Sequence, residues 1–184
     1  PPSSQTVLDE FAQVEGLSGS AYGDVLRGDD VDALTIINHR GFLGSLLQDP
    51  SLIDGLQEFL GGGVTSFGGG NIIPGGAGSD IIEGRGGDDL IDGDKWLNVR
   101  VSVRDANDPS IEIRSVDSLK ELIPDMLSGA INPGQLQIVR EILYAEGSTD
   151  TDTATFSGVL ANYTVAVAAD GTAVVTDISG GIEG

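Results

Sequence analysis

The chain has no cysteine, one histidine, one tryptophan and only nine basic residues. Without cysteine, no disulfide can hold the fold, and a single histidine leaves too few nitrogen or sulfur ligands for a zinc site. The same shortage argues against hydrolase sites of the Ser/His/Asp and Cys/His types, which need a histidine base and, in the second type, a cysteine. The sequence therefore predicts no catalytic activity of these kinds, and His39 is interpreted as a surface residue.

The shortage of positive charge also limits the partners of the chain. Its 29 acidic residues against nine basic ones give a net charge of −20 over 184 residues. Such a charge is repelled by nucleic acid and by anionic membranes and favours bound cations. No apolar run approaches the roughly 18 residues of a membrane-spanning helix. Aromatic residues make up 5% of a chain with 28 glycines, so a metal ion is the expected source of additional folding free energy.

A nine-residue repeat stands at the centre of the chain. Residues 75–83 read GGAGSDIIE and residues 84–92 read GRGGDDLID. Both follow the pattern G-G-x-G-x-D-x-U-x, where U is a large apolar residue, except that Arg85 takes position two. This pattern is typical of a parallel β-roll that binds Ca²⁺. The glycines permit a tight turn with inward carbonyls, the aspartate supplies an anionic oxygen, and the apolar residue enters a narrow core.

The repeat extends towards the N-terminus in degenerate form. Residues 66–74 keep the nine-residue period with Asn71 in place of the aspartate, and residues 19–27 carry Asp24 at that position. If residues 28–65 are an insertion between two turns, these segments and the tandem pair become four consecutive nonapeptides. Because successive turns would fall on opposite edges, turns two repeats apart are expected to stack and to hold an ion between them.

The other segments predict the remaining elements. Helical spacing appears at 41–48, 51–60, 115–127 and 133–144, a strand at 96–104 is expected to pair with 111–114, and 163–168 with 172–177 should form a hairpin around Asp170-Gly171. The predicted fold class is mixed α+β, with a short parallel β-roll, helical insertions and a C-terminal β-hairpin. Residues 1–94 would form the roll region, with its helical insertion at about 28–65. Residues 95–184 would form an α+β segment packed on the roll or continuing it.

The tandem nonapeptides resemble those of the RTX family, the hemolysin-type calcium-binding repeats of secreted bacterial proteins. The resemblance implies one site in which the carbonyls of Ser20 and Tyr22 with Asp24 face the carbonyls of Gly75 and Ala77 with Asp80. It implies a second site from Phe67, Gly69 and Asn71 facing Gly84, Gly86 and Asp89, weakened by the missing charge of Asn71. An incomplete third site would join Gly76, Gly78 and Asp80 to the region of Gly93 and Asp94. The other nearby aspartates are interpreted as solvated charges: Asp29, Asp30, Asp88, Asp92 and Asp94.

The flanking segments resemble a narrower group. GLSGSAYGDVLRGDD, INPGQLQIVREIL and DTATFSGVLANYTV look like the calcium-binding region of very large bacterial proteins that also carry an animal-type heme peroxidase domain. A heme site needs an axial ligand and separate acid–base groups, so this chain is not expected to be the peroxidase. The resemblance implies type I secretion from a Gram-negative bacterium, an extracellular location, and folding on meeting Ca²⁺. The expected partners are calcium ions and the rest of a parent protein, of which this chain would be a piece.

Two other functions remain open. Some modules associated with RTX proteins cleave themselves at Asp-Pro bonds when calcium binds, and the chain has two such bonds, at Asp49-Pro50 and Asp108-Pro109. Both dipeptides also suit ordinary turns or helix caps. Alternatively, the chain could be a calcium-dependent adhesive module that binds carbohydrate through Trp96 and carboxylates, although Trp96 begins an alternating strand and is expected to be buried.

Overall fold

A computed structural model describes residues 16–30, 47–145 and 149–181. The strands are β1 (Val25–Arg27), β2 (Ile72–Pro74), β3 (Ile81–Glu83), β4 (Leu90–Asp92), β5 (Lys95–Arg104), β6 (Glu112–Val116), β7 (Leu136–Tyr144), β8 (Thr153–Ala154), β9 (Tyr163–Val167) and β10 (Ala173–Asp177). The helices are α2 (Leu56–Phe59) and α3 (Ile123–Ser128), with 3₁₀ turns η1 (Pro50–Leu52), η2 (Leu119–Leu122), η3 (Pro133–Gln135) and η4 (Leu160–Asn162). None of the helices in these ranges has the length and apolar character needed to cross a membrane.

The predicted fold class, mixed α+β with a parallel β-roll, is wrong. The structure is mainly strand (36%) with little helix (16%), and its sheets are small and several of them antiparallel. The physical reason is the length of the strands. The nonapeptide strands have three residues each, whereas the longest ladder is antiparallel and joins nine residue pairs of β5 and β7.

The nonapeptide strands nevertheless pair in the order that the repeat predicts. β1 and β3 are parallel, with Leu26 opposite Ile82, and β2 and β4 are parallel, with Ile73 opposite Ile91. The partners therefore lie two nonapeptides apart, and the apolar residue at position eight of each meets its counterpart. Leu26, Ile73 and Ile82 are buried in one cluster, against which Ile91 packs. β8 adds to the other side of β3, again in parallel.

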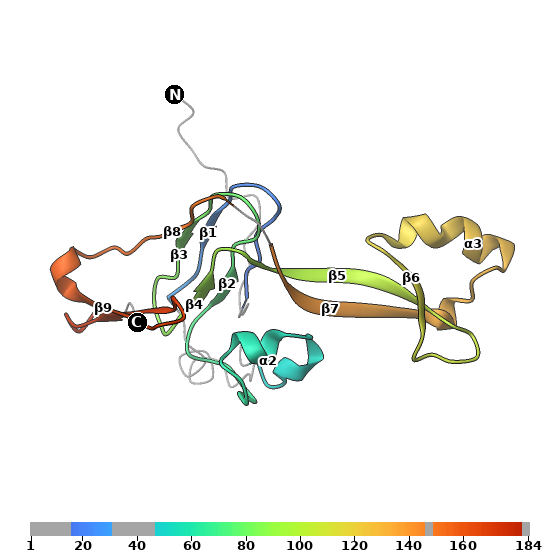
Figure 1. Ribbon diagram of the computed structural model, residues 1–184, viewed down its shortest axis with the longest axis horizontal. Helices are drawn as coiled ribbons and strands as arrows, with labels where there is room; N and C mark the ends of the chain where they lie inside the picture. Colours follow the sequence, from blue (N-terminus) through green and yellow to red (C-terminus); the bar gives the residue numbers. More distant parts are fainter. Residues whose placement is uncertain (1–15, 31–46, 146–148, 182–184) are drawn as a thin grey trace, which may run out of the picture.

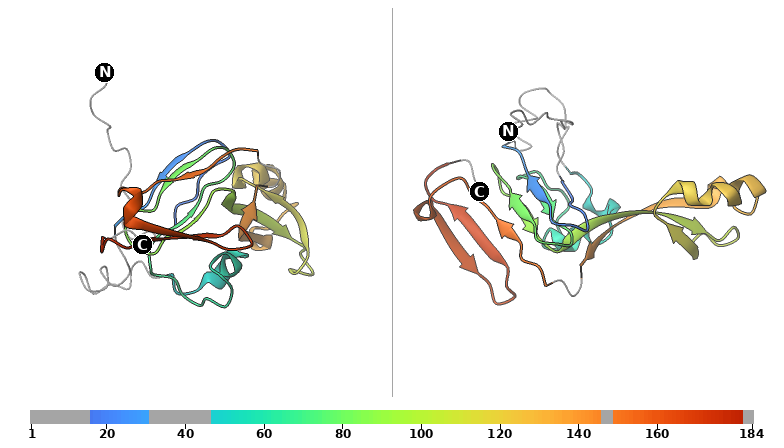
Figure 2. Two further views of the ribbon diagram at one scale, coloured as in Figure 1. Left: turned by 60° about the vertical axis from the view of Figure 1, so that its left-hand side comes forward. Right: turned by 90° about the horizontal axis from the view of Figure 1, so that it is seen from above.

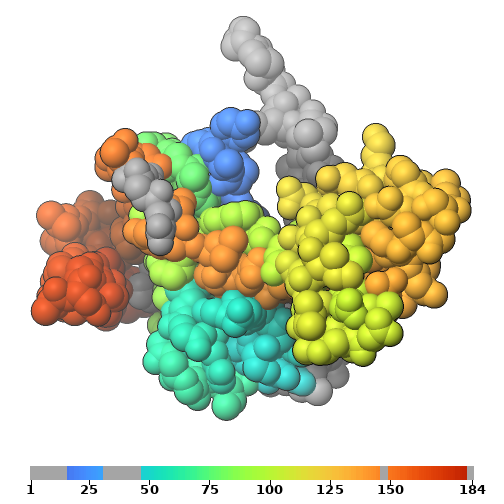
Figure 3. Space-filling model, turned by 45° about the vertical axis from the view of Figure 1, so that its right-hand side comes forward, coloured from blue at the N-terminus to red at the C-terminus, as the bar shows by residue number. Residues whose placement is uncertain are grey.

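A long arm projects from these short strands (Figures 1 and 2). It consists of β5 paired on one side with β6 and on the other with β7, both antiparallel. The strand predicted at 96–104 and its pairing with the segment near 111–114 are thus confirmed. On one face Val101, Val103, Leu122 and Ile131 form a second buried cluster. In the space-filling view the tip of the arm and the C-terminal hairpin lie on opposite sides of the molecule (Figure 3).

The predicted helix at 133–144 is wrong, because β7 occupies most of it. Asn132 caps only the short turn η3, where its side chain accepts a hydrogen bond from the Gly134 N–H at 2.8 Å. The chain then extends along β5, and Glu141 meets Arg100 and Asn98 from the neighbouring strand. Tertiary pairing and these cross-strand contacts outweigh a helical periodicity that is also compatible with a strand.

The other sequence predictions have mixed outcomes. The helix predicted at 115–127 begins later, at η2 and α3, because its first residues continue β6. The segment 51–60 is helical only in part, as η1 and α2. The hairpin is confirmed, with β9 antiparallel to β10. Residues 41–46 of the helix predicted at 41–48, and His39, lie outside the described residues.

The buried cluster of the arm gives a stability test. Leu122 is fully buried, whereas Leu127, in the next helical turn, is 84% exposed. Leu122→Ala should lower the free energy of unfolding by about 2–5 kcal/mol because it leaves a cavity. Leu127→Ala should change it by no more than about 0.5 kcal/mol. Urea denaturation followed by the fluorescence of Trp96, which lies on β5, measures both, and equal effects would contradict the assigned core.

Candidate metal centre

Each turn of the nonapeptides sets a glycine at position one against the side chain at position six. A Cβ placed on Gly75 would lie 2.5 Å from Asp80 Oδ2, and one on Gly84 would lie 2.1 Å from Asp89 Oδ2. These separations are shorter than any ordinary contact, so only glycine lets the carboxylate fold back over its own turn. The carboxylate is thereby held against the first residue of its own turn.

Two of the turns are split by insertions. A Cβ on Gly28 would lie 2.3 Å from Asn71 Oδ1, and one on Gly93 would lie 2.0 Å from Asp152 Oδ2. Gly28 and Asn71 are therefore the two halves of one turn, and Gly93 and Asp152 are the halves of another. The whole arm is inserted within the second split turn. The nonapeptide pattern predicted that residues 28–65 are inserted between two turns. In the structure this insertion lies inside a turn, because Gly28 and Asn71 belong to the same turn.

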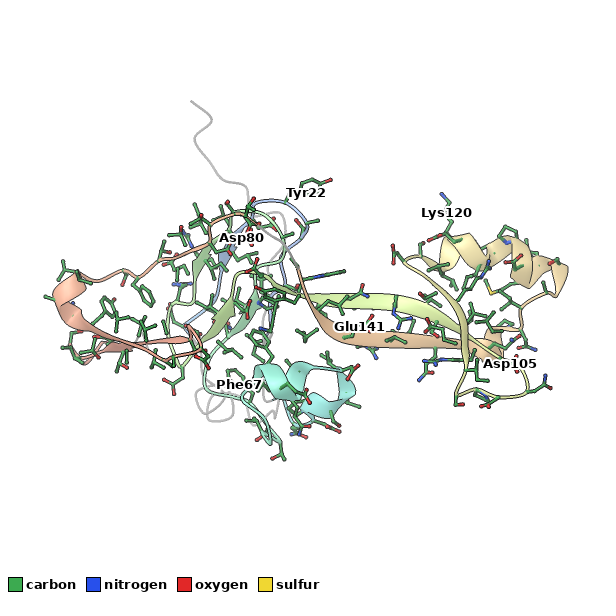
Figure 4. All side chains as sticks on the ribbon, viewed as in Figure 1. Tyr22, Phe67, Asp80, Asp105, Lys120 and Glu141 are labelled. Carbon is green, nitrogen blue, oxygen red and sulfur yellow. The ribbon has the colours of Figure 1, made fainter. Side chains whose placement is uncertain are left out.

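The split of the first turn changes one predicted ligand. The Asp29 carbonyl accepts a hydrogen bond from the Gly86 N–H at 3.1 Å, just as the Ser20 carbonyl accepts one from Ala77 at 3.0 Å. Asp29 thus occupies position two, which the sequence assigned to Phe67. Phe67 instead exchanges two backbone hydrogen bonds with Leu47, so its carbonyl is engaged outside the turn. Figure 4 shows Phe67 towards α2.

The side chains at position six form two ladders. In the first, the Asp24 N–H donates to Asp80 Oδ1 at 2.7 Å, and the Asp80 N–H donates to Asp152 Oδ1 at 2.9 Å. In the second, the Asn71 N–H donates to Asp89 Oδ1 at 2.8 Å. Each later side chain therefore uses one oxygen to join the preceding turn. Three carboxylates are stacked in the first ladder.

Asp80, in the middle of the first ladder, is the most constrained of them. It lies among the short strands (Figure 4) and is only 1% exposed. Its Oδ2 is buried and has no hydrogen-bond donor among the described residues. Burial raises the pKa of Asp80, and the charges of Asp152, Asp24 and Asp150 raise it further, although the hydrogen bond from the Asp24 N–H opposes them. A buried anionic oxygen without a donor is costly unless a cation meets it.

No protein-family model, curated protein or solved structure matches this chain. Function is therefore inferred from the chemistry of the turns themselves.

The structure brings most of the predicted ligands together. In the first predicted site, the turn with Ser20, Tyr22 and Asp24 packs against the turn with Gly75, Ala77 and Asp80, and a Cβ on Gly78 would lie 2.7 Å from the Tyr22 carbonyl carbon. In the second, Gly69 and Asn71 meet Gly84, Gly86 and Asp89, since the Asp88 N–H donates to the Gly69 carbonyl at 2.9 Å. Phe67 is the exception.

Two side chains that the sequence did not suggest, those of Asp150 and Asp152, meet the turn of the predicted third site. The Gly78 N–H donates to Asp150 Oδ2 at 2.6 Å, and the Gly76 N–H donates to the Lys95 carbonyl at 2.9 Å. Asp150 and Asp152 belong to residues 147–155, GSTDTDTAT, which has glycine at position one and aspartate at position six. That weak match was the available signal for this segment.

Three of the five aspartates that were predicted to be solvated have side-chain contacts. Asp94 lies with Asp150 and Asp152, with one carboxylate oxygen of each within 4.8 Å of the others. Asp92 is half-buried and pairs with Lys95. Asp30 pairs with Arg85 at 2.6 Å, whereas Asp88 is exposed.

Both Asp-Pro bonds lie where turns or caps were expected. Asp49 caps η1, accepting a hydrogen bond from the Ser51 N–H at 3.1 Å. Asp108 Oδ1 accepts from the N–H and hydroxyl of Ser110 at 3.0 and 2.6 Å, and these bonds lower the pKa of Asp108. Trp96, the candidate carbohydrate-binding residue, is half-buried on β5.

The position of Asp80 predicts an unusual dependence on pH. Because its pKa is raised in the folded state, the folded chain holds this proton more tightly than the unfolded chain does. In buffer free of divalent ions, the contribution of Asp80 to stability should therefore fall as the pH rises from the ordinary aspartate pKa through the raised value, and stay low above it. Asp80→Asn should remove this loss, so near neutral pH the variant should be at least as stable as the wild type.

Urea denaturation of both proteins between about pH 4 and pH 7 measures the difference. Asparagine keeps an oxygen that can accept from the Asp24 N–H, so the comparison isolates the charge. A wild type more stable than the variant at every pH would contradict the assigned environment of Asp80.

Proposed function

We propose that this chain binds Ca²⁺ between its stacked turns and that ion binding stabilises the folded state. The observation that carries the proposal is the ladder of Asp24, Asp80 and Asp152, in which the buried Asp80 Oδ2 has no donor among the described residues. Stacking three carboxylates with one of them fully buried is unfavourable in the absence of a cation. The glycines that these side chains cover make the arrangement specific rather than accidental.

The donor atoms favour calcium over other common metals. The turns offer carboxylate oxygens, one amide oxygen at Asn71, and backbone carbonyls. Calcium takes six to eight such oxygens at about 2.3–2.6 Å in a flexible geometry, whereas Mg²⁺ requires a compact octahedron and Zn²⁺ prefers nitrogen and sulfur. With Ca²⁺, Ser20, Tyr22 and Asp24 would serve one ion with Gly75, Ala77 and Asp80.

The second ion would lie at the other edge of the strands. Its ligands would be Asn71 and Gly69 with Gly84, Gly86 and Asp89, and Asp29 would take the place predicted for Phe67. Asn71 contributes an oxygen without a charge, so this position should bind more weakly than the first.

Ion binding would act through linkage. Asp24, Asp80 and Asp152 are far apart along the chain, so the unfolded state cannot offer them together. A ligand that binds only the folded state stabilises it by RT ln(1 + [L]/Kd), or about 1.4 kcal/mol for each tenfold excess. Extracellular calcium modules bind at about 10⁻⁴–10⁻³ M. A site of that affinity is filled outside a cell and not in the cytoplasm.

In this proposal the chain is a non-catalytic, extracellular part of a larger secreted bacterial protein, and the resemblance of residues 75–92 to RTX repeats supports it. The chain would bind calcium, and be stabilised by it, only outside the cell. The rest of the parent protein would be its partner. The net charge of −20 is consistent with a chain that folds around cations.

Removing calcium tests the proposal directly. The melting temperature should be higher in millimolar Ca²⁺ than in EDTA, because the ions bind only the folded state, and Mg²⁺ at the same concentration should restore little of the difference. Circular dichroism during thermal unfolding measures this. Identical melting in Ca²⁺ and in EDTA would rule the proposal out.

The contribution of the first ladder can be tested separately. Asp80→Asn should raise the calcium concentration at half-saturation of binding by about tenfold or more, since it removes a buried charged ligand. Asp88→Asn is the matched control, because Asp88 lies in the adjacent turn but is exposed, and it should shift the midpoint little. Calorimetric titration with Ca²⁺ gives both midpoints, and equal shifts would show that the register of the ladder is wrong.

A further inference from the structure

We infer that a cavity at the tip of the arm binds a small zwitterion of the amino-acid type, with its carboxylate on Arg104 and its ammonium group on Asp105. The cavity lies where β5 ends and η3 leads into β7. Arg104 and Asp105 line it together with the apolar side chains of Ala106, Pro109 and Leu136. Its volume is about 290 Å³, at the lower end of the range of about 300–1,000 Å³ that is usual for ligand pockets. The cavity therefore suits a small ligand.

Arg104 is a half-buried cation without an acceptor. Its Nε is buried and has no hydrogen-bond partner among the described residues. In the strand register Arg104 stands opposite Glu112, but Glu112 Oε2 accepts from Arg100 Nη1 and from the Ser102 hydroxyl, both at 2.6 Å. A partly desolvated guanidinium without an acceptor is unfavourable. Because Nε is covered, the Nη atoms would bind the ligand, and their planar arrangement suits a carboxylate.

Asp105 supplies the opposite charge to the same cavity. It lies at the end of the arm that is farther from the short strands (Figure 4). Its Oδ1 accepts from the backbone N–H groups of Asn107 and Asp108 at 2.8 and 3.1 Å, which holds the carboxylate in its turn. Although Arg104 and Asp105 are adjacent in sequence, their side chains form no ion pair with each other. The cavity thus presents a positive and a negative group that do not neutralise each other.

The wall of the cavity on the side of η3 is fixed by the Gln135 side chain. Its Nε2 donates to the Arg104 carbonyl at 2.8 Å, and its Oε1 accepts from the Asn132 N–H at 2.9 Å. Both ends of this amide are engaged within the protein, so Gln135 positions the backbone of Arg104 and does not contact the ligand through hydrogen bonds. A site held in this way loses little conformational freedom on binding.

The distribution of charge favours a zwitterion over an anion. The chain as a whole has a net charge of −20, but most of its nine basic residues lie in the arm: Lys95, Arg100, Arg104, Arg114, Lys120 and Arg140. A phosphate or a dicarboxylate would be repelled by the acidic remainder of the chain and by Asp105. A ligand without net charge is not repelled in this way, and its ammonium group makes Asp105 an attractive contact.

The test titrates the full chain with three related probes and follows the NMR resonances of the Arg104 Nε–H and the Ala106 amide. L-Alanine carries both charged groups, propionate lacks the ammonium group, and L-alaninamide lacks the carboxylate. Alanine should shift both resonances to saturation. Propionate should bind about tenfold more weakly, because one charged hydrogen-bonding group is lost. Alaninamide should not shift the Arg104 resonance.

Two substitutions assign the charged contacts, and the probe series in the wild type does not depend on how they fold. Arg104→Gln should abolish alanine binding at the Ala106 amide, whereas Arg140→Gln, the same change at an exposed arginine of β7, should leave it unchanged. Asp105→Asn keeps an oxygen that accepts from the Asn107 N–H, and it should make the affinities for alanine and propionate equal.

The inference is overturned if alanine causes no saturable shift, if alaninamide or propionate binds the wild type as tightly as alanine, or if Arg104→Gln and Arg140→Gln have equal affinities. The arm has its own buried cluster, so alanine should bind in EDTA as well as in Ca²⁺. Failure of calcium binding by the turns would therefore leave this result unchanged, and the two proposals can fail separately.

Discussion

The stacking of like charges along the first ladder is the constraint on which the rest of the structure depends. Backbone hydrogen bonds place Asp24, Asp80 and Asp152 in register, and the short parallel strands follow directly from that register. The same bonds force carboxylates together and bury the central one. Backbone geometry and electrostatics therefore oppose each other in this ladder, and a cation is the simplest component that satisfies both.

The small size of the core makes this conflict important. Strands of three residues bury few side chains, and the cluster beneath the turns contains Leu26, Ile73 and Ile82 with Ile91 beside it. The hydrophobic contribution of so few residues is modest. The arm has its own cluster around Leu122, so it does not depend on the ladders for its packing. Stability in the two regions therefore has different origins: apolar packing in the arm and, under the proposed function, bound ions in the turns.

The sequence predicted the local features well and the long-range ones poorly. A nine-residue period is visible in one stretch of chain, so the pairing of strands two repeats apart and the inward position-eight residues could be predicted. The joining of Gly93 to Asp152 could not, because the arm separates them and residues 147–155 match the repeat weakly. The assignment of Phe67 failed for the same reason: the continuous nonapeptide 66–74 hid the fact that Asp29 completes the turn. β7 was missed because apolar spacing in 133–144 suits a helix as well as a strand, and only pairing with β5 decides between them.

The positions of the two insertions suggest how such a fold accepts them. Both interrupt a turn between its glycine at position one and its side chain at position six, not a strand. A strand must be continuous to keep its ladder, but the two halves of a turn need only present their oxygens to the same point. In the proposed function, an ion bonded to both halves of a split turn would hold them together where no short peptide connection does. The cost of closing a long loop grows slowly with its length, so an ion that closes the turn can support an insertion as large as the arm.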